Sequence, residues 1–280
     1  MPSNDKIILD QVLEQERQGL ALDTDPASFF ELFTAEQILK DYDLSIDEIR
    51  SGIVGGGGDG GIDAFYVFVN GELIQEDTDV SGYKRNVSID VYLVQSKTSN
   101  SFSESTMERF ISVSSEIFNL ANKVEQLDSV YNERVIEIAR TFRDTYQTLA
   151  SKFPNLSFHY YYATKGDIVH PNVLRKVDRI KEVINQYFSS AVFCFNFLTS
   201  GDLLNLARQS PCKSHELKLA ENPISTSDNA AFVCLVSIKD FNKFISDSQG
   251  HLLRHIFEAN VRDYQGKAQV NEQIQETLQT

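Results

Sequence analysis

A glycine run interrupts the chain at residues 55–61, where all but one residue, Asp59, are glycine. Glycine is costly to order in a helix or strand and tolerates left-handed backbone, so this run predicts a loop or tight turns. The following sequence, IDAFYVFV at 62–69, is rich in β-branched and aromatic residues and predicts a strand. Asn70-Gly71 closes that strand with a strong hairpin signal. The sequence VSIDVYLVQSK at 87–97 predicts the next strand.

Helical and strand patterns alternate through the rest of the chain. A helix is expected to begin at Thr24 or Asp25, where a capping residue precedes Pro26 in the first turn. Further helices are expected at 5–18, 103–152 (one or two helices), 171–188, 201–209 and 239–247, and further strands at 156–164, 191–199 and 231–238. This order predicts an α/β fold with a mixed central sheet flanked by helices. We place a domain at 1–210 and a smaller C-terminal α/β segment at 211–280.

The net charge of the chain is -14. Nucleic-acid-binding proteins usually carry a basic surface, so this charge opposes tight non-specific binding, although it permits a local basic site. No stretch reaches the ~20 apolar residues of a membrane span, and the N-terminus has acidic residues where a signal peptide has Lys or Arg. Cys194, Cys212 and Cys234 are scattered and form no CxxC pair. We expect a cytoplasmic protein with no membrane partner.

The two strands nearest the glycine run carry polar residues at the ends of apolar rows. Side chains two apart share a strand face. One face of the strand at 87–97 is formed by Val87, Ile89, Val91, Leu93, Gln95 and Lys97. On the strand at 62–69, Asp63 shares a face with Phe65, Val67 and Val69. An acid, an amide and an ammonium are therefore expected close together if both rows face the core.

Two interpretations of these polar residues stay open. In the first, the second strand ends at Val94 and the last residues are solvated. In the second, Asp63, Gln95 and Lys97 converge, because burying polar groups without partners costs roughly 2–7 kcal/mol. Carboxylate and amide oxygens suit Mg²⁺, which polarises a phosphoryl group, while a lysine stabilises developing negative charge. The second interpretation is typical of a divalent-metal phosphodiesterase.

The sequence GGGGDGGIDAFYVF…VYLVQSK resembles the Mrr-like branch of the PD-(D/E)xK restriction-endonuclease superfamily, in which GxDGGID precedes a strand bearing Q-x-K. A Phe-Glu pair on the preceding helix of that branch is matched by Phe30-Glu31. The resemblance implies a restriction-endonuclease-like fold for residues 1–210, with Glu31, Asp63, Gln95 and Lys97 as the catalytic set. Glu31, Asp63 and Gln95 would hold Mg²⁺ or Mn²⁺, and Lys97 would be the catalytic lysine.

Two acids near this motif have open roles, and one spacing departs from the family. Asp59 either hydrogen-bonds the glycine turn or joins the site. Glu36, five residues after Glu31, points elsewhere on the helix and is only a weak substitute. The gap between Asp63 and Gln95 exceeds that of most family members, and a hairpin extension at 70–86 would absorb it.

The C-terminal sequence HIFEANVRDYQGKAQVNEQIQETL resembles the signature of the AIPR family of bacterial abortive-infection phage-resistance proteins. The matching residues are Phe257, Asn260, Val261, Arg262, Gly266, Val270, Asn271, Ile274 and Leu278. This resemblance implies a role in phage defence, with residues 211–280 as the start of a module that is longer in the family. The alternative is an ordinary helix-turn-helix in which Gly266 is the C-cap.

A basic cluster on the helix expected at 171–188 is a candidate nucleic-acid contact. It contains Arg175, Lys176 and Arg179, of which the two arginines share a helix face. Either these cations form a solvated face, paired with Asp178 and Glu182, or they contact phosphates beside the cleft.

Together these patterns predict a metal-dependent nuclease of prokaryotic phage defence that hydrolyses DNA or RNA, with DNA favoured. The first alternative is a catalytically inactive nucleic-acid-binding or protein-interaction module that retains the nuclease fold. Neutral Gln95 and the acidic net charge favour this alternative. The second is an interaction scaffold whose partner surface is the helical region 103–152. The sequence leaves open whether the chain is a monomer or a homo-oligomer.

Overall fold

The computed structural model of the chain describes residues 3–19, 24–42, 44–84, 86–209, 217–225 and 232–246. The chain divides into two units, Met1–Pro211 and Cys212–Thr280. The described helices of the first unit are α1 (Asn4–Gly19), α2 (Pro26–Leu39), α3 (Ile46–Ser51), α4 (Glu104–Ile117), α5 (Glu133–Leu149), α6 (Pro171–Leu174), α7 (Lys176–Tyr187) and α8 (Ser200–Arg208). Its strands are β1 (Ala64–Val69), β2 (Glu72–Leu73), β3 (Ser88–Lys97), β4 (Asn155–Thr164) and β5 (Val192–Leu198).

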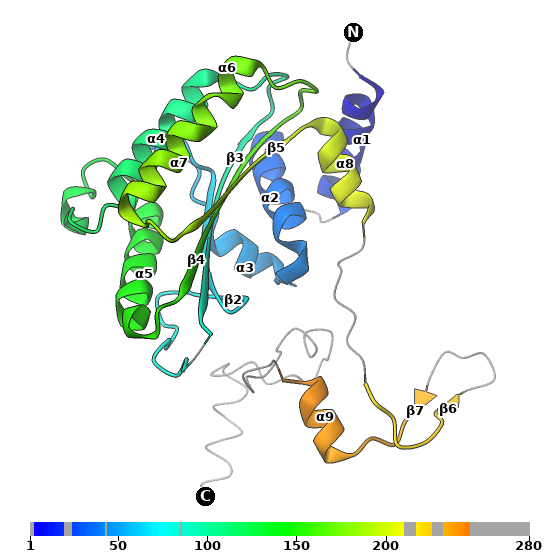
Figure 1. Cartoon of the computed structure of the whole chain (residues 1–280). Helices are drawn as coiled ribbons and strands as arrows, with labels where there is room; N and C mark the ends of the chain where they lie inside the picture. Colours follow the sequence, from blue (N-terminus) through cyan, green and yellow to red (C-terminus); the bar gives the residue numbers. More distant parts are fainter. Residues whose placement is uncertain are drawn as a thin grey trace, which may run out of the picture. The chain divides into compact units, whose positions relative to one another are not determined.

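The strands of the first unit form a mixed sheet in the order β2-β1-β3-β4-β5 (Figure 1). β1 runs antiparallel to β2 and β3, whereas β3, β4 and β5 are parallel. The parallel strands need crossover connections, and α4 with α5, and α6 with α7, supply them. The predicted α/β fold with a mixed, helix-flanked sheet is confirmed.

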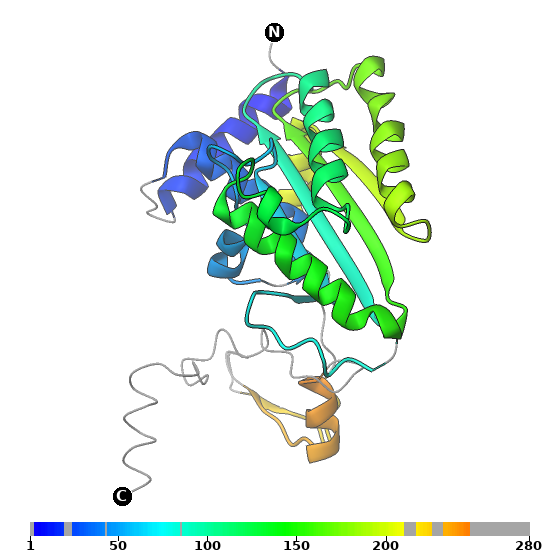
Figure 2. The same ribbon diagram turned by 90° about the vertical axis from the view of Figure 1, so that its left-hand side faces the viewer.

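Helices cover both faces of this sheet, as Figures 1 and 2 show. Residues of α4, α5 and α7 pack in one large apolar cluster with one face of β1, β3 and β4. Residues of α1, α2, α3 and α8 form two smaller clusters with the opposite face. None of the described helices is long and apolar enough to cross a membrane.

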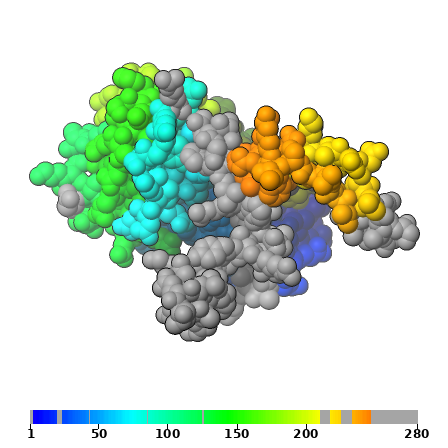
Figure 3. Space-filling view, turned by 90° about the horizontal axis from the view of Figure 1, so that it is seen from below, coloured from blue at the N-terminus to red at the C-terminus, as the bar shows by residue number. Residues whose placement is uncertain are grey.

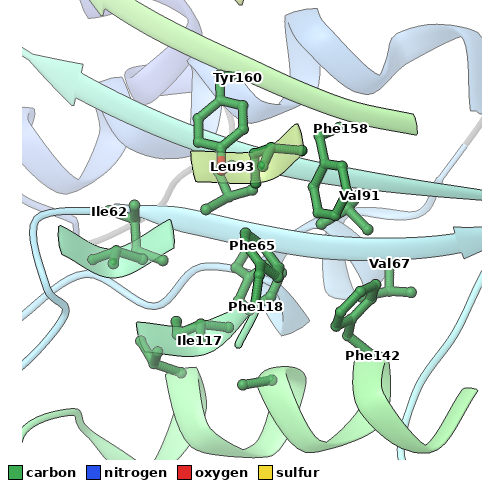
Figure 4. Close-up of a cluster of buried hydrophobic side chains, with 14 of the residues drawn as sticks. Ile62, Phe65, Val67, Val91, Leu93, Ile117, Phe118, Phe142, Phe158 and Tyr160 are labelled. Carbon is green, nitrogen blue, oxygen red and sulfur yellow. The ribbon is translucent and has the colours of Figure 1, made fainter. Parts of the chain in front are cut away.

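The structure buries both faces of β1 and of most of β3, and the predicted apolar rows form one of the two buried faces. Phe65 and Val67 of β1 and Val91 and Leu93 of β3 belong to the larger cluster, beside Phe118 (Figure 4). Burial of each such side chain contributes about 1.5–3 kcal/mol to the stability of the fold. The apolar rows therefore face α4 and α5. Asp63, Gln95 and Lys97, which continue these rows, belong to the same face of the sheet.

The connection between β1 and β3 has the predicted hairpin at its start. Asn70 and Gly71 have φ values of 52° and 87°, which suit a turn of the primed type. β2 then pairs with the end of β1, and residues 74–87 lead back to β3. This extension accommodates the long spacing between Asp63 and Gln95. Figure 3 shows the segment around β2 (cyan) beside α5 (green). Residues of the two segments, among them Arg134 and Glu137 of α5, line a pocket.

Three elements differ from the sequence predictions. The helix expected at 171–188 is broken at Arg175 into α6 and α7. α3 was not predicted, although Ser45 and Glu48 form its capping box. In the second unit, the strand expected at 231–238 is only β7 (Phe232–Val233), which pairs with β6 (Ile224–Ser225) before α9 (Ile238–Phe244). The strand prediction was wrong beyond 233.

Candidate metal and active site

Asp63 is fixed by its backbone at the point where the glycine loop enters β1. Its N–H donates to the carbonyl of Val94 at 2.8 Å, which continues the β1–β3 pairing by one residue. Its own carbonyl accepts hydrogen bonds from the N–H groups of Val54 and Gly55, at 2.8 and 3.2 Å. Hydrogen bonds at both its N–H and its carbonyl therefore fix the backbone that carries the Asp63 carboxylate.

β3 continues past Val94 and buries Gln95 completely, with 0% of the residue exposed. Gln95 Nε2 donates to Asp63 Oδ2 at 2.5 Å, and the Ser96 N–H donates to the same oxygen at 2.6 Å. The interpretation in which the strand ends at Val94 and its last residues are solvated is wrong for Gln95. The predicted acid and amide are in direct contact.

The amide oxygen of Gln95 is buried and makes no hydrogen bond in the described part of the chain. Leaving a buried acceptor unpaired costs about 1–3 kcal/mol. The nitrogen of the same amide is directed to Asp63, so the oxygen is left to face another donor or a cation. This orphaned oxygen distinguishes the site from an ordinary buried amide, which pairs at both ends.

Glu31 approaches the site from α2, on the other face of the sheet. α2 begins with Asp25 as its N-cap, whose side chain accepts from the N–H groups of Ala27 and Ser28. The half-buried Glu31 lies against the glycine loop, because a Cβ built on Gly55 would be 2.8 Å from Glu31 Oε2. The absence of a side chain at Gly55 therefore makes room for this carboxylate.

Both carboxyl groups have raised pKa values. Burial raises the pKa of Glu31 to about 7, and the charge of Asp63 adds to the rise. Burial likewise raises the pKa of Asp63 to about 6, although the Ser96 N–H, Lys97 and Gln95 oppose the rise. Raised pKa values of neighbouring acids are a common feature of functional sites.

Lys97, the last residue of β3, lies within electrostatic reach of both acids. Its positive charge lowers the pKa of Glu31 and of Asp63. Among the described residues its ammonium makes no hydrogen bond or ion pair, and the side chain is partly exposed. The structure thus brings Glu31, Asp63, Gln95 and Lys97 together at the C-terminal end of β3.

The donor set fits a small divalent cation. No group of three or more His, Cys, Asp or Glu side chains suited to a metal occurs within the described residues. Mg²⁺ does not need one, since it keeps several waters and is commonly bound through one or two carboxylates. Glu31 and Asp63 supply two carboxylates, and the unpaired oxygen of Gln95 supplies a neutral ligand.

The two other acids near the motif have different positions. Asp59 Oδ1 accepts a hydrogen bond from the Gly61 N–H at 2.6 Å, which is the turn role. Its charge also raises the pKa of Glu31 and Asp63, so it adds negative potential without contacting them. Burial raises the pKa of Glu36, and the charge of Glu16 of α1 adds to the rise.

The basic cluster predicted to contact nucleic acid is engaged by protein groups. Lys176 Nζ lies 2.5 Å from Glu108 Oε1 and 3.5 Å from Glu104 Oε2. Arg179 Nη1 lies 3.3 Å from Glu108 Oε1, and Arg175 donates to the side chain of Asn172. The acids that pair with Lys176 and Arg179 come from α4, rather than from Asp178 and Glu182.

Two residues beside the site were not identified from the sequence. Gly55 was counted only as part of the glycine run, and Arg109 was not singled out at all. A Cβ built on Gly61 would be 2.3 Å from Arg109 Cδ, so α4 lays this arginine across the loop that leads into Asp63. No local pattern signals a contact between residues so far apart in the chain.

Comparisons with family models, with curated proteins and with solved structures found no match to this chain. The residues of the AIPR resemblance, 257–278, lie outside the described residues.

Proposed function

We propose that this chain is a metal-dependent nuclease that hydrolyses phosphodiester bonds of DNA or RNA, as part of a prokaryotic defence against phage. The observation that carries the proposal is the convergence of Glu31, Asp63, Gln95 and Lys97, with an unpaired buried amide oxygen among them. The resemblances to the Mrr-like and AIPR families supply the biological setting, which is part of the proposal.

The chain's own residues divide the chemistry among them. Glu31, Asp63 and Gln95 Oε1 would hold Mg²⁺ or Mn²⁺, which when bound supplies Lewis-acid polarisation of a phosphoryl oxygen. The Ser96 N–H and Gln95 Nε2 fix the orientation of the Asp63 carboxylate. The free ammonium of Lys97 would stabilise the negative charge that develops on the phosphate.

A catalytically inactive nucleic-acid-binding module is the second candidate. Two observations favour it: the residue at 95 is a neutral amide whose nitrogen is already bonded to Asp63, and the net charge is -14. In that case these residues would still bind a cation and nucleic acid, but the protein would not cut the nucleic acid.

The test is cleavage of plasmid DNA and structured RNA with Mg²⁺ by wild type, Lys97→Ala and Lys176→Ala. We expect Lys97→Ala to lower the cleavage rate by about 10²–10³-fold, the usual cost of losing one group that stabilises transition-state charge. Lys176→Ala is the matched control and should cut within about twofold of wild type, because its ammonium is held by Glu104 and Glu108 in a surface ion pair.

The outcomes separate the two candidates. Cleavage that persists unchanged in Lys97→Ala would indicate a contaminating nuclease, and the assignment of nuclease activity to this chain would fail. Binding of nucleic acid without cleavage by wild type would favour the inactive module.

A further inference from the structure

A nuclease site needs cations that hold the nucleic-acid backbone, in addition to the groups that perform the chemistry. Phosphate contacts supply much of the affinity and fix the orientation of the strand. Lys176 and Arg179 are occupied by Glu108, so their charges are already balanced within the protein. The cation that serves this role should be exposed, unpaired among the described residues, and beside the loop that leads into Asp63.

Arg109 of α4 has these properties. Its aliphatic stem crosses Gly61, because a Cβ built there would be 2.3 Å from Arg109 Cδ and 3.0 Å from Arg109 Cβ. Gly61 has a φ of 83° and precedes Asp63 by two residues. Arg109 is exposed, and its guanidinium makes no hydrogen bond or ion pair with any described residue.

Arg109 and Lys97 also lie on the same side of the sheet. The strand face that carries Leu93 packs against α4, and Gln95 and Lys97 continue that face to the end of β3. Glu31, by contrast, comes from α2 on the opposite side. The two unpaired cations are therefore on the α4 side of the carboxylates.

The segment that joins these two cations suits a polyanion. Its first part, residues 98–103, contains no Asp or Glu, and the two acids that follow before Arg109, Glu104 and Glu108, pair with Lys176 and Arg179 of α7. Residues 98–101, Thr-Ser-Asn-Ser, are exposed and follow Lys97 directly. Hydroxyl and amide side chains of this kind are common donors to phosphate oxygens.

We propose that Arg109 binds the sugar–phosphate backbone of the nucleic acid beside the cleavage position, with Lys97 on the scissile phosphate and residues 98–101 between them. This inference rests on the proposed function. It moves the nucleic-acid contact from the α6–α7 cations to α4 and the loop before it.

The experiment measures binding of fluorescent duplex DNA, single-stranded DNA and single-stranded RNA of about 20 nucleotides by anisotropy, with Ca²⁺ in place of Mg²⁺ and at several salt concentrations. Arg109→Gln keeps part of the stem over Gly61 and removes the charge, whereas Arg109→Lys keeps the charge. Arg140→Gln is the matched control, since Arg140 is an exposed arginine on α5 that also has no ion pair among the described residues.

We expect Arg109→Gln to weaken binding about 5- to 10-fold and to reduce the slope of log K against log salt by about 1, the signature of one lost phosphate contact. Arg109→Lys should retain most of the affinity, and Arg140→Gln should match wild type. The probe bound most tightly identifies the class of nucleic acid.

Three results would overturn the inference. If wild type binds and cuts while Arg109→Gln and Arg140→Gln have the same affinity and slope, the assignment of Arg109 fails and the proposed function stands. A weaker Arg109→Gln with an unchanged slope would show that the arginine only supports the glycine loop. If wild type binds none of the probes at low salt, the inference and the proposed function fall together.

Discussion

Two charged regions of the first unit contrast in how their charges are arranged. In the candidate site, Glu31 and Asp63 are carboxylates of like charge, withdrawn from water, and both have raised pKa values. In the ion-pair cluster formed by Glu104, Glu108, Lys176 and Arg179, acids of α4 meet bases of α7 at the surface. There the hydrogen bond from Lys176 lowers the pKa of Glu108.

The direction of these pKa shifts separates two uses of charge. A lowered pKa means that the fold stabilises the ionised acid, as a structural ion pair does. A raised pKa means that the fold disfavours the ionised acid, and a bound cation would reduce that cost. The sequence indicates both regions as candidates for function, and among the described residues the first retains unpaired groups, Gln95 Oε1 and the Lys97 ammonium.

Outside the proposed catalytic set, the largest effect is expected from Gly55, whose missing side chain leaves room for Glu31. Gly55→Ala would place a Cβ 2.8 Å from Glu31 Oε2, so the flexible end of the glutamate must move. A displacement of this size can cost up to about 100-fold in rate, and we expect cleavage to fall about 10- to 100-fold. Thermal stability should change little, because the group that moves is a side-chain end.

Gly57→Ala is the matched control. A Cβ built on Gly57 has no atom within 4 Å, and its φ is not in the left-handed region. Cleavage by Gly57→Ala should match wild type. Equal losses in both variants would mean that the loop tolerates no side chain for reasons unrelated to Glu31.

A smaller effect, on thermal stability, is expected when one acid in each region is neutralised. The two changes should have opposite signs when stability is measured without metal, in EDTA. The pKa values of Glu31 and Asp63 exceed their ordinary values of 4.5 and 3.8, so the stability linked to these groups is fully present below about pH 4. It is lost as the pH rises through about 6 and 7. At pH 8, Glu31→Gln should therefore stabilise the metal-free protein by about 1 kcal/mol, less than the full shift because the carboxyl is only half-buried.

The matched variant Glu108→Gln should lower stability slightly at pH 8 instead. The lowered pKa of Glu108 means that its contribution is present at neutral pH and is lost as the pH falls through that lowered value. Melting temperatures at pH 5 and pH 8 measure both effects. A destabilised Glu31→Gln at pH 8 would show that Glu31 makes a favourable interaction in the metal-free protein. The candidate site and the ion-pair cluster would then not differ in how they affect stability.

Much of the fold could be predicted because its signals are local. The period-2 rows of β1 and β3, the Asn70-Gly71 turn and the Asp25-Pro26 start of α2 each depend on residues close in sequence. α3 was missed although its Ser45–Glu48 capping box was visible, because the helix is short and has no apolar period of its own.

The site was predicted in outline but not in detail. Alternation predicted that Asp63, Gln95 and Lys97 lie close together if both rows face the core, and the buried contact between Asp63 and Gln95 bears this out for these two residues. Alternation could not predict which end of the amide meets the acid, and hence that Gln95 Oε1 is left unpaired. Nor could it pair Lys176 with Glu108, since that contact depends on how α4 and α7 pack across 68 residues of chain.

The most direct test of the central claim is a titration with Mn²⁺ at pH 8, followed by electron paramagnetic resonance or calorimetry, on wild type, Asp63→Asn and the control Glu108→Gln. We expect wild type and Glu108→Gln to bind a single Mn²⁺ with equal affinity. Asp63→Asn should lose at least about 100-fold in Mn²⁺ affinity, more than the cost of disturbing a supporting group. Wild type that binds no Mn²⁺, or an Asp63→Asn variant that binds it as tightly as wild type, would contradict the claim that these acids form a cation site.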